Sequence, residues 1–320
     1  MRTLLIREND AGQRLDKFLH KAVPKLPQSL LYKYLRTKRI KVNGRRSEIS
    51  YRLLSGDTVE LYINDEFFEE SPERDFLLAP ATVDIVYEDE NILLADKPAG
   101  LCVHEDNDNT VDTLIHRILH YLYDKGEYRP EDELSFTPAL CNRIDRNTSG
   151  IVIAAKNAES LRILNEAIRQ REIQKFYLCV VDGAVRPPQG TMTAYLLRRE
   201  NDSTVEVFDR PRPDARTIVT SYRTLKSSRR NTLLEVELKT GRTHQIRAHF
   251  AHIGHPLLGD GKYGIGKLNR EYGLRQQLLC SYKLRFAFSG EEHLLTYLNG
   301  REISLPLSKI WFAEEFEERF

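Results

Sequence analysis

Residues 142–150 read N-R-I-D-R-N-T-S-G and lead directly into an apolar run at residues 151–155. The apolar run predicts a buried strand, so the polar stretch is the turn before it. Asp145 lies in this turn between the guanidiniums of Arg143 and Arg146. A carboxylate that nearby cations keep ionised can serve as a nucleophile or a base, which makes this turn the first candidate for a catalytic centre. A solvated charged turn before a strand is the alternative.

The chain has 320 residues, of which 41% are apolar, so it is long enough for two domains with cores of their own. Its 48 basic and 47 acidic residues give a net charge of +1, so the overall charge indicates neither nucleic acid nor membrane as a partner. The four cysteines lie far apart, which favours reduced thiols over disulfides. The N-terminus has no apolar signal segment and no stretch is long enough to cross a membrane, so we expect a cytoplasmic protein.

Residues 1–64 are predicted to form a separate small α/β RNA-binding domain. They end in an alternating strand pattern, and the helix that precedes it is dense in cations with tyrosines between them. The cations that we expect to contact RNA phosphates are Lys33, Arg36, Arg39, Lys41 and Arg45. A solvated helix face is the alternative, but the nearly one-sided sign of the charge favours nucleic acid.

Residues 65–80 are acidic, contain two prolines and show no sustained periodicity, so they are predicted to be a linker to a larger domain at residues 81–320. Predicted strands in that domain are residues 83–87, 92–95, 151–155, 176–181, 217–222, 233–238 and 284–288. Predicted helix N-caps in the whole chain are Ser29, Asn109 or Thr110, Asn157 and Thr243. The later strands follow one another with few helices between them, which indicates an α+β fold with a mixed, largely antiparallel sheet.

A second polar segment, residues 239–264, follows a predicted strand and contains a short helix. Its four histidines are His244, His249, His252 and His255. Their spacing comes without the cysteines or carboxylates of a common zinc site, so no metal is predicted. Either Arg242 or Arg247 can bring a forked cation to Asp145 if the two segments meet, and the alternative is two surface arginines. Residues 96–100, D-K-P-A-G, lack the glycine pattern of a nucleotide-phosphate loop, so no nucleotide cofactor is predicted.

Four segments together give the chain a resemblance to a known family over nearly its whole length. They are D-K-P-A-G-L at residues 96–101, R-I-D with T-S-G at 143–150, K-F-Y at 175–177 and G-R-T-H-Q-I-R at 241–247. In this order they resemble the pseudouridine synthases of the ribosomal large-subunit type. The N-terminal residues are similar to the small RNA-binding domain that is often joined to this family and is named after a small-subunit ribosomal protein.

The resemblance implies an enzyme that detaches the uracil of a uridine in RNA, turns it and rejoins it to the ribose through carbon 5, without a cofactor. It implies that Asp145 is the nucleophile or base and Arg247 its ion-pair partner, while Tyr177 stacks on the base and assists proton removal. The residues expected to contact the RNA around them are Arg143, Thr148, Arg242 and His244. Arg143 is expected to occupy the space that the flipped nucleotide leaves.

Two departures from the family pattern bear on RNA recognition and not on the carboxylate chemistry. Asn142 stands where the family usually has His, and residues 277–280 replace a segment that usually contains His. The attached small domain favours large-subunit ribosomal RNA over transfer RNA as the target. Two other functions stay open: a catalytically silent RNA-binding or ribosome-assembly protein, and an RNA nucleosidase in which an aspartate attacks the sugar and water completes the reaction.

Overall fold

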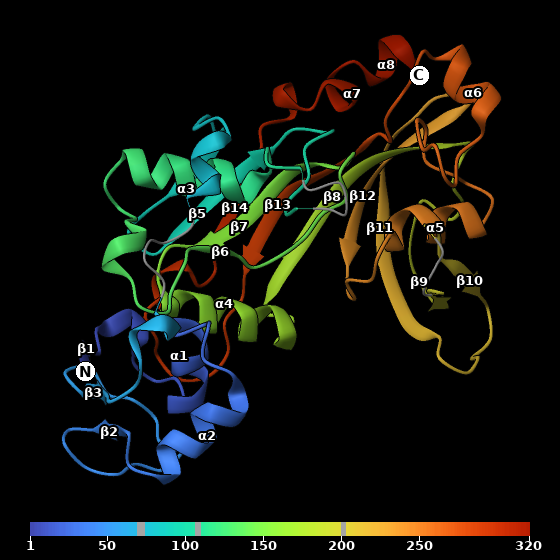
Figure 1. Cartoon of the computed structure of the whole chain (residues 1–320). Coiled ribbons are helices and arrows are strands. Elements are labelled where there is room, and N and C mark those ends of the chain that lie inside the picture. Colours follow the sequence, from blue (N-terminus) through green and yellow to red (C-terminus); the bar gives the residue numbers. More distant parts are fainter. Residues whose placement is uncertain (69–73, 106–109, 200–202) are drawn as a thin grey trace.

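The computed structural model describes residues 1–68, 74–105, 110–199 and 203–320. Figure 1 shows a small N-terminal unit, in blue, beneath one end of a long sheet that runs through the rest of the molecule. The N-terminal unit has a hydrophobic core of its own, and the larger unit has its main cores on the two faces of the sheet. Within the described residues, no helix combines the length and the apolar character that crossing a membrane requires.

The N-terminal unit is a three-stranded antiparallel sheet covered by two helices. Strand β3 (Thr58–Leu61) lies between β1 (Arg2–Leu5) and β2 (Ile40–Val42). Helices α1 (Leu15–Ala22) and α2 (Gln28–Arg36) bury the apolar faces that their leucine spacing predicts. The predicted cap Ser29 is wrong, because the N-cap is Pro27, two residues earlier, and its fixed φ suits the start of a helix.

The larger unit is built on one extended sheet. Its strands are β4 (Ile85–Glu88), β5 (Ile92–Lys97), β6 (Ala139–Leu140), β7 (Ser149–Ala155), β8 (Ile173–Asp182), β9 (Gln189–Leu197), β10 (Glu206–Phe208), β11 (Arg216–Ser227), β12 (Asn231–Leu238), β13 (Leu279–Phe286) and β14 (Glu302–Ser304). They follow the order β10-β9-β11-β12-β8-β13-β7-β5-β4, with β14 beside β13 and β6 beside β7. Among these described strands only β13 and β7 pair in parallel. The predicted α+β fold with a largely antiparallel sheet is confirmed.

Helices cover both faces of this sheet. They are α3 (Leu114–Asp124), α4 (Ala158–Gln170), α5 (Gln245–His252), α6 (Gly266–Glu271), α7 (Trp311–Glu314) and α8 (Phe316–Arg319). Along β8, Tyr177 and Cys179 join the core that contains residues of α3 and α5. Leu178 and Val180 point to the opposite face and join the core that contains residues of α4, α7 and α8.

The structure corrects several predicted boundaries. Helix α4 begins after Asn157, whose side chain accepts a hydrogen bond from Ser160 N, as predicted. Helix α3 is capped by Thr113 and not by Thr110, because a bridge with Cys102 holds residue 113 beside the end of an earlier segment; Asn109 lies outside the described residues. Strands β9 and β10 were not predicted, since their exposed residues obscure the apolar alternation.

The predicted linker is packed at both ends. Phe68 is buried in the core of the N-terminal unit, and Phe76, in a short 3₁₀ helix at Asp75–Leu78, is buried in the larger unit. Residues 69–73 of the predicted linker lie outside the described residues. The acidic composition of residues 65–80 predicted a linker but did not reveal its two aromatic anchors.

Position 150 lets two strands meet directly behind the turn that carries Asp145. Gly150 has a φ of +107°, and a Cβ at this position would lie 2.2 Å from the carbonyl oxygen of Ser281 in β13. Ser281 pairs with Gly150 on one side and with Tyr177 in β8 on the other. Strand β13 therefore sets the separation between the Asp145 turn and Tyr177.

We expect Gly150→Ala to lower the free energy of unfolding by about 3 kcal/mol, since the added methyl group meets backbone atoms and the positive φ strains any side chain. Urea unfolding measures the loss. Gly126→Ala is the matched control, because Gly126 has a φ of +76° but a Cβ there would meet nothing within 4 Å. We expect about 1 kcal/mol for the control, and equal losses for both variants would show that the contact with Ser281 is unimportant.

Candidate active site

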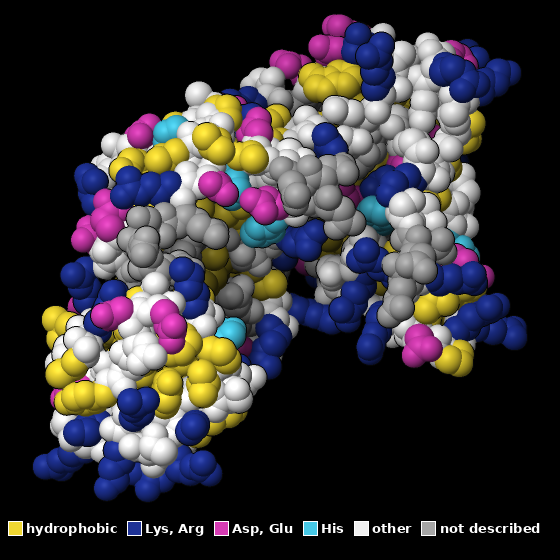
Figure 2. Space-filling model, in the orientation of Figure 1, with side chains coloured by type: hydrophobic (Ala, Val, Ile, Leu, Met, Phe, Trp, Pro, Cys, Tyr) yellow, Lys and Arg dark blue, Asp and Glu magenta, His cyan; other side chains and the backbone are white. Residues whose placement is uncertain are grey.

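One cavity of about 1570 Å³ gathers the polar residues that the sequence singled out in the larger unit. Its lining includes Arg143, Asp145, Thr148, Tyr177, Arg242, His244 and Arg247. Figure 2 shows a hollow between the N-terminal unit and the opposite lobe, with Lys and Arg side chains on both sides. The segments that meet here are the turn before β7, strand β8 and the start of α5, which lie far apart in the sequence.

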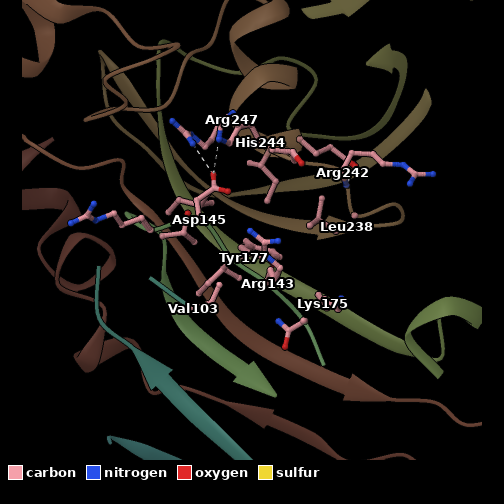
Figure 3. A pocket seen from close by; sticks show the side chains of 18 of the residues that line it. Val103, Arg143, Asp145, Lys175, Tyr177, Leu238, Arg242, His244 and Arg247 are labelled. Carbon is pink, nitrogen blue, oxygen red and sulfur yellow. Dashed lines mark hydrogen bonds and ion pairs between the residues drawn. The ribbon is translucent and has the colours of Figure 1, made fainter. Parts of the chain in front are cut away.

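Arg247 lies at the centre of the charged group in this cavity. Its guanidinium holds Asp260 with two hydrogen bonds, Nε to Oδ2 at 2.7 Å and Nη2 to Oδ1 at 2.9 Å. The remaining nitrogen, Nη1, donates to Asp145 Oδ2 at 2.7 Å (Figure 3). Arg247 is 5% exposed and Asp260 1%, so this is a buried cation between two carboxylates. Of the two arginines that the sequence left open, the structure pairs Arg247 with Asp145.

The charges in this group stabilise one another against burial. Burial alone would lower the pKa of Arg247, but the hydrogen bonds and charge of Asp260, and then those of Asp145, raise it. Burial would raise the pKa of Asp260, yet the fork of Arg247 holds it below its usual value. Asp260 is therefore an ionised anchor that orients Arg247. The sequence pattern assigned Asp260 no such role, and its one signal there is its place in the turn-rich segment G-D-G-K-Y-G at residues 259–264, after α5.

His244 lies beside the ion pair at the start of α5. Its Nε2 is 3.8 Å from Asp145 Oδ2, and its Nδ1 is 2.9 Å from the hydroxyl oxygen of Tyr263. Burial lowers the pKa of His244, although the charge of Asp145 acts in the opposite direction, so the ring is largely neutral at pH 7. The predicted cap Thr243 is wrong: His244 takes the N-cap position with a φ of +54°, since Gln245 ties the preceding turn through Thr240 and the backbone N–H of Arg242.

A buried lysine holds the turn that carries Asp145. Lys97, at the end of β5, is fully buried, and its ammonium donates to the carbonyl oxygens of Pro98, Leu101 and Arg146 at 2.8 to 2.9 Å. The N–H of Gly100 donates to the same Arg146 carbonyl at 2.8 Å. The D-K-P-A-G-L segment, in which the sequence indicated a family resemblance but no nucleotide-phosphate loop, therefore positions the backbone next to Asp145.

Tyr177 lies in β8 below Asp145 (Figure 3) and is 6% exposed. Burial raises the pKa of its hydroxyl to about 12, and the negative charge of Asp145 acts in the same direction. The hydroxyl is therefore protonated at neutral pH.

The other predicted RNA contacts in the cavity differ in exposure. Arg143 and Arg242 are exposed, and neither guanidinium has a hydrogen-bond or ion-pair partner among the described residues. Thr148 is buried, and its hydroxyl accepts a hydrogen bond from Gln277 Nε2 at 3.1 Å. Asn142, the first departure from the family pattern, is also buried, and its Oδ1 accepts from Ile153 N at 2.8 Å. Positions 142 and 277 thus both support the turn from within.

The four histidines of residues 239–264 have separate partners. His249 contacts Thr220, His252 contacts Asp209, and His255 contacts the carbonyl oxygen of Asp182. No group of three or more His, Cys, Asp or Glu side chains with the geometry to hold a metal ion occurs in the part of the chain that the structure describes.

The predicted cations of the N-terminal unit do not line the cavity. Lys33, Arg36, Arg39 and Arg45 are exposed, and Lys41 is half-buried. Two of them lie on tyrosines: Arg39 is 5.2 Å from the ring centre of Tyr34, and Lys41 is 5.0 Å from that of Tyr62. They form a second basic surface, on α2 and the residues around β2.

Two family profiles match the chain. The RNA pseudouridylate synthase profile matches residues 91–252, which include Asp145, Tyr177 and Arg247, and the S4 domain profile matches residues 13–59. Ribosomal large subunit pseudouridine synthase C of Vibrio cholerae serotype O1 is 31% identical over 310 residues, 94% of this chain and 92% of that relative. Ribosomal large subunit pseudouridine synthase D of Escherichia coli strain K12 is 34% identical over 263 residues, 82% of this chain and 76% of that relative.

A solved structure has the same fold. Human RNA Pseudouridylate Synthase Domain Containing 4 superposes with a TM-score of 0.56 at 21% identity, covering 74% of this chain and 93% of its own.

We expect Lys97 to make stability depend on pH. Burial lowers the pKa of its ammonium to about 8, against 10.5 for an unperturbed lysine. Between these values the unfolded chain holds a proton that the folded chain has released, so the free energy of unfolding rises with pH through this group. In urea unfolding from pH 7 to 10, the difference between wild type and Lys97→Met should therefore grow above pH 8. The exposed Lys267→Met is the control, and a pH-independent difference for Lys97→Met would contradict the expectation.

Proposed function

Because the chain belongs to the RNA pseudouridylate synthase family, it is an RNA-binding isomerase of uridine, and we propose that Asp145 carries out the reaction on large-subunit ribosomal RNA. The observation that carries this proposal is the ionised group in the cavity, in which Arg247 holds one oxygen of Asp145. In the isomerisation the bond from ribose C1′ to uracil N1 breaks and a bond from C1′ to C5 forms. C5 loses a proton and N1 gains one, so atoms and charge balance and no cofactor is consumed.

Asp145 is suited to act directly on the reacting uridine. Its Oδ2 accepts from Arg247, whereas Oδ1 accepts no hydrogen bond from the described residues. The carboxylate is half-buried and lines the cavity. The ion pair with Arg247 fixes the orientation of the carboxylate, so that the second oxygen is available as a nucleophile at C1′ or as a base.

Tyr177 is proposed to stack on the uracil. Its ring supplies a face for an unstacked base and lies on the floor of the same cavity. A hydroxyl with a pKa of about 12 carries its proton at neutral pH, which disfavours Tyr177 as an independent base. We therefore assign it binding, with any proton removal at C5 dependent on Asp145.

Arg143 and Arg242 are proposed to hold the RNA around the target nucleotide. Both are exposed cations on the rim of the cavity without partners among the described residues, so they are available for phosphates or for the place of a flipped base. His244 is suited to contact the nucleotide as a neutral ring beside Asp145. The buried hydroxyl of Thr148 is engaged by Gln277, which fits support of the turn better than contact with RNA.

The proposed division of labour follows the two parts of the chain. Residues 1–64 bind RNA through the cations on α2 and around β2, residues 65–80 connect, and residues 81–320 carry out the isomerisation. Both relatives named above are called large-subunit synthases, which supports ribosomal RNA over transfer RNA as the target. We propose the cytoplasm as the compartment, since bacterial ribosomes are assembled there.

Asp145→Asn should abolish turnover while RNA affinity changes less than about tenfold, because the amide keeps the shape of the carboxylate but loses its charge, and the phosphate contacts lie elsewhere. The assay is tritium release from uridine-5-labelled ribosomal RNA of cells that lack this protein. The control is Asp124→Asn at an exposed position of α3, which should behave as wild type. Release by Asp145→Asn at the wild-type rate would remove Asp145 from the mechanism, and free uracil as the product would indicate a nucleosidase.

The triple variant Arg36→Ala, Arg39→Ala and Lys41→Ala should weaken RNA binding and flatten its salt dependence, by roughly one unit of the log–log slope for each cation that contacts a phosphate. Binding titrations between low and high salt measure the slope. The matched control removes three cations from the end of β11 and the turn that follows it, by Lys226→Ala, Arg229→Ala and Arg230→Ala. The same slope for wild type and the first triple variant would mean that this surface does not touch RNA.

A further inference from the structure

We propose that the N-terminal unit is fixed to the catalytic unit by a polar latch, so that its basic surface and the catalytic cavity recognise RNA at a set separation. The latch consists of Arg7, Asn9, Asp10 and Gln13 on the N-terminal side and of residues 132–135 with the start of α4 on the catalytic side. This inference rests on the proposed RNA-binding role of the N-terminal unit. The fixed separation lets the protein select among RNA substrates in a way that neither the N-terminal unit nor the catalytic unit has alone.

Asn9 joins the two units with both ends of its amide. Its Nδ2 donates to Glu133 Oε1 at 2.9 Å, and its Oδ1 accepts from the backbone N–H of Ala158 at 3.1 Å. Ala158 is the first residue of α4, where backbone N–H groups lack partners within the helix. One side chain of the N-terminal unit therefore helps to cap a helix of the catalytic unit.

Asp10 and Gln13 form the second point of the latch around Ser135. The hydroxyl of Ser135 donates to Asp10 Oδ1 at 2.6 Å and accepts from Gln13 Nε2 at 2.7 Å. Gln13 also donates to the carbonyl oxygen of Asp10 at 3.0 Å. Asp10 is 1% exposed, so its carboxylate is withdrawn from water at the junction and depends on this partner.

Further contacts flank the two points. Arg7 Nη1 donates to the carbonyl oxygen of Asp132 at 2.7 Å. Arg162, on α4, donates through Nη1 to the carbonyl oxygen of Ala11 at 2.8 Å. Leu134 packs against the core of the N-terminal unit. The junction is thus mostly hydrogen-bonded, and because each unit keeps a core of its own, the junction can be broken without removing either core.

Helix α4 sets the distance between the latch and the catalytic cavity. It begins at the latch with Ala158 and ends at Gln170. Ile168 and Arg169 in its last turn, and Arg171 directly after it, line the catalytic cavity. At about 1.5 Å per residue the helix is roughly 20 Å long. Figure 1 shows the N-terminal unit beneath α4, and Figure 2 shows cations around the hollow between the units and the opposite lobe. The part of a bound RNA that contacts the N-terminal unit must therefore lie at a fixed distance from the target uridine.

The test breaks the latch from either side. One variant is Asn9→Ala with Gln13→Ala, and the other is Glu133→Ala with Ser135→Ala. The matched control, Gln28→Ala with Asn64→Ala, removes the same residue types from exposed sites of the N-terminal unit outside the latch. Chemical mapping of the wild-type product on large-subunit ribosomal RNA first locates the modified uridine. Each protein is then assayed by tritium release on that labelled RNA and on a short hairpin that contains this uridine, and small-angle X-ray scattering gives the radius of gyration.

We expect both latch variants to have a larger radius of gyration, and a KM on the long RNA raised about tenfold with kcat unchanged. Their kinetics on the hairpin should equal those of wild type, and combining the two variants should add no further loss, because they break the same junction. An unchanged KM on the long RNA, or equal losses on both RNAs, would overturn the inference. Absence of release by the wild-type protein on either RNA would instead count against the proposed function.

Discussion

A single buried guanidinium links the parts of the proposed catalytic centre. Arg247 uses two nitrogens for Asp260, 13 residues further along the chain, and the third for Asp145, 102 residues earlier. A buried cation is stable only when its donors are matched, and removing one partner of such a pair typically costs about 3–5 kcal/mol. The fold must therefore bring the turn before β7, helix α5 and the segment after it together, and this requirement fixes where the cavity lies.

Backbone contacts give the same centre its precision. Lys97 and Gly100 both donate to the carbonyl oxygen of Arg146, directly after Asp145. On the other side, the close approach of Gly150 to Ser281 keeps β13 between β7 and β8, and so spaces Asp145 from Tyr177. A reacting carboxylate displaced by even 1 Å loses much of its effect. The buried lysine and the glycine thus position the proposed catalytic carboxylate without lying in its place themselves.

Charge is balanced over the whole chain but not over its surface. The net charge of +1 gave no sign of a nucleic-acid partner, yet exposed arginines lie on the rim of the cavity and on α2. This uneven distribution of charge matters because phosphate binding depends on the electrostatic field within about a Debye length of the surface and not on the net charge of the chain. Because the N-terminal unit is docked on the larger unit, the basic surface on α2 and the basic rim of the cavity have fixed positions relative to each other, with α4 between them.

Features that depend on near neighbours along the chain follow from the sequence alone. The strand after Asp145, the apolar faces of α1 and α2, the cap at Asn157 and the largely antiparallel sheet all follow from local spacing and residue type. Residue spacing left Arg242 and Arg247 open, the family resemblance pointed to Arg247, and the structure shows Arg247 paired with Asp145. The roles of Asp260 and Lys97 and the contact of Asn9 with α4 emerge only in the folded chain. Each of these is a contact between distant segments or a buried charge whose partner is fixed by packing. Residue order carries no direct signal for such pairs, because their geometry exists only once the sheet has formed.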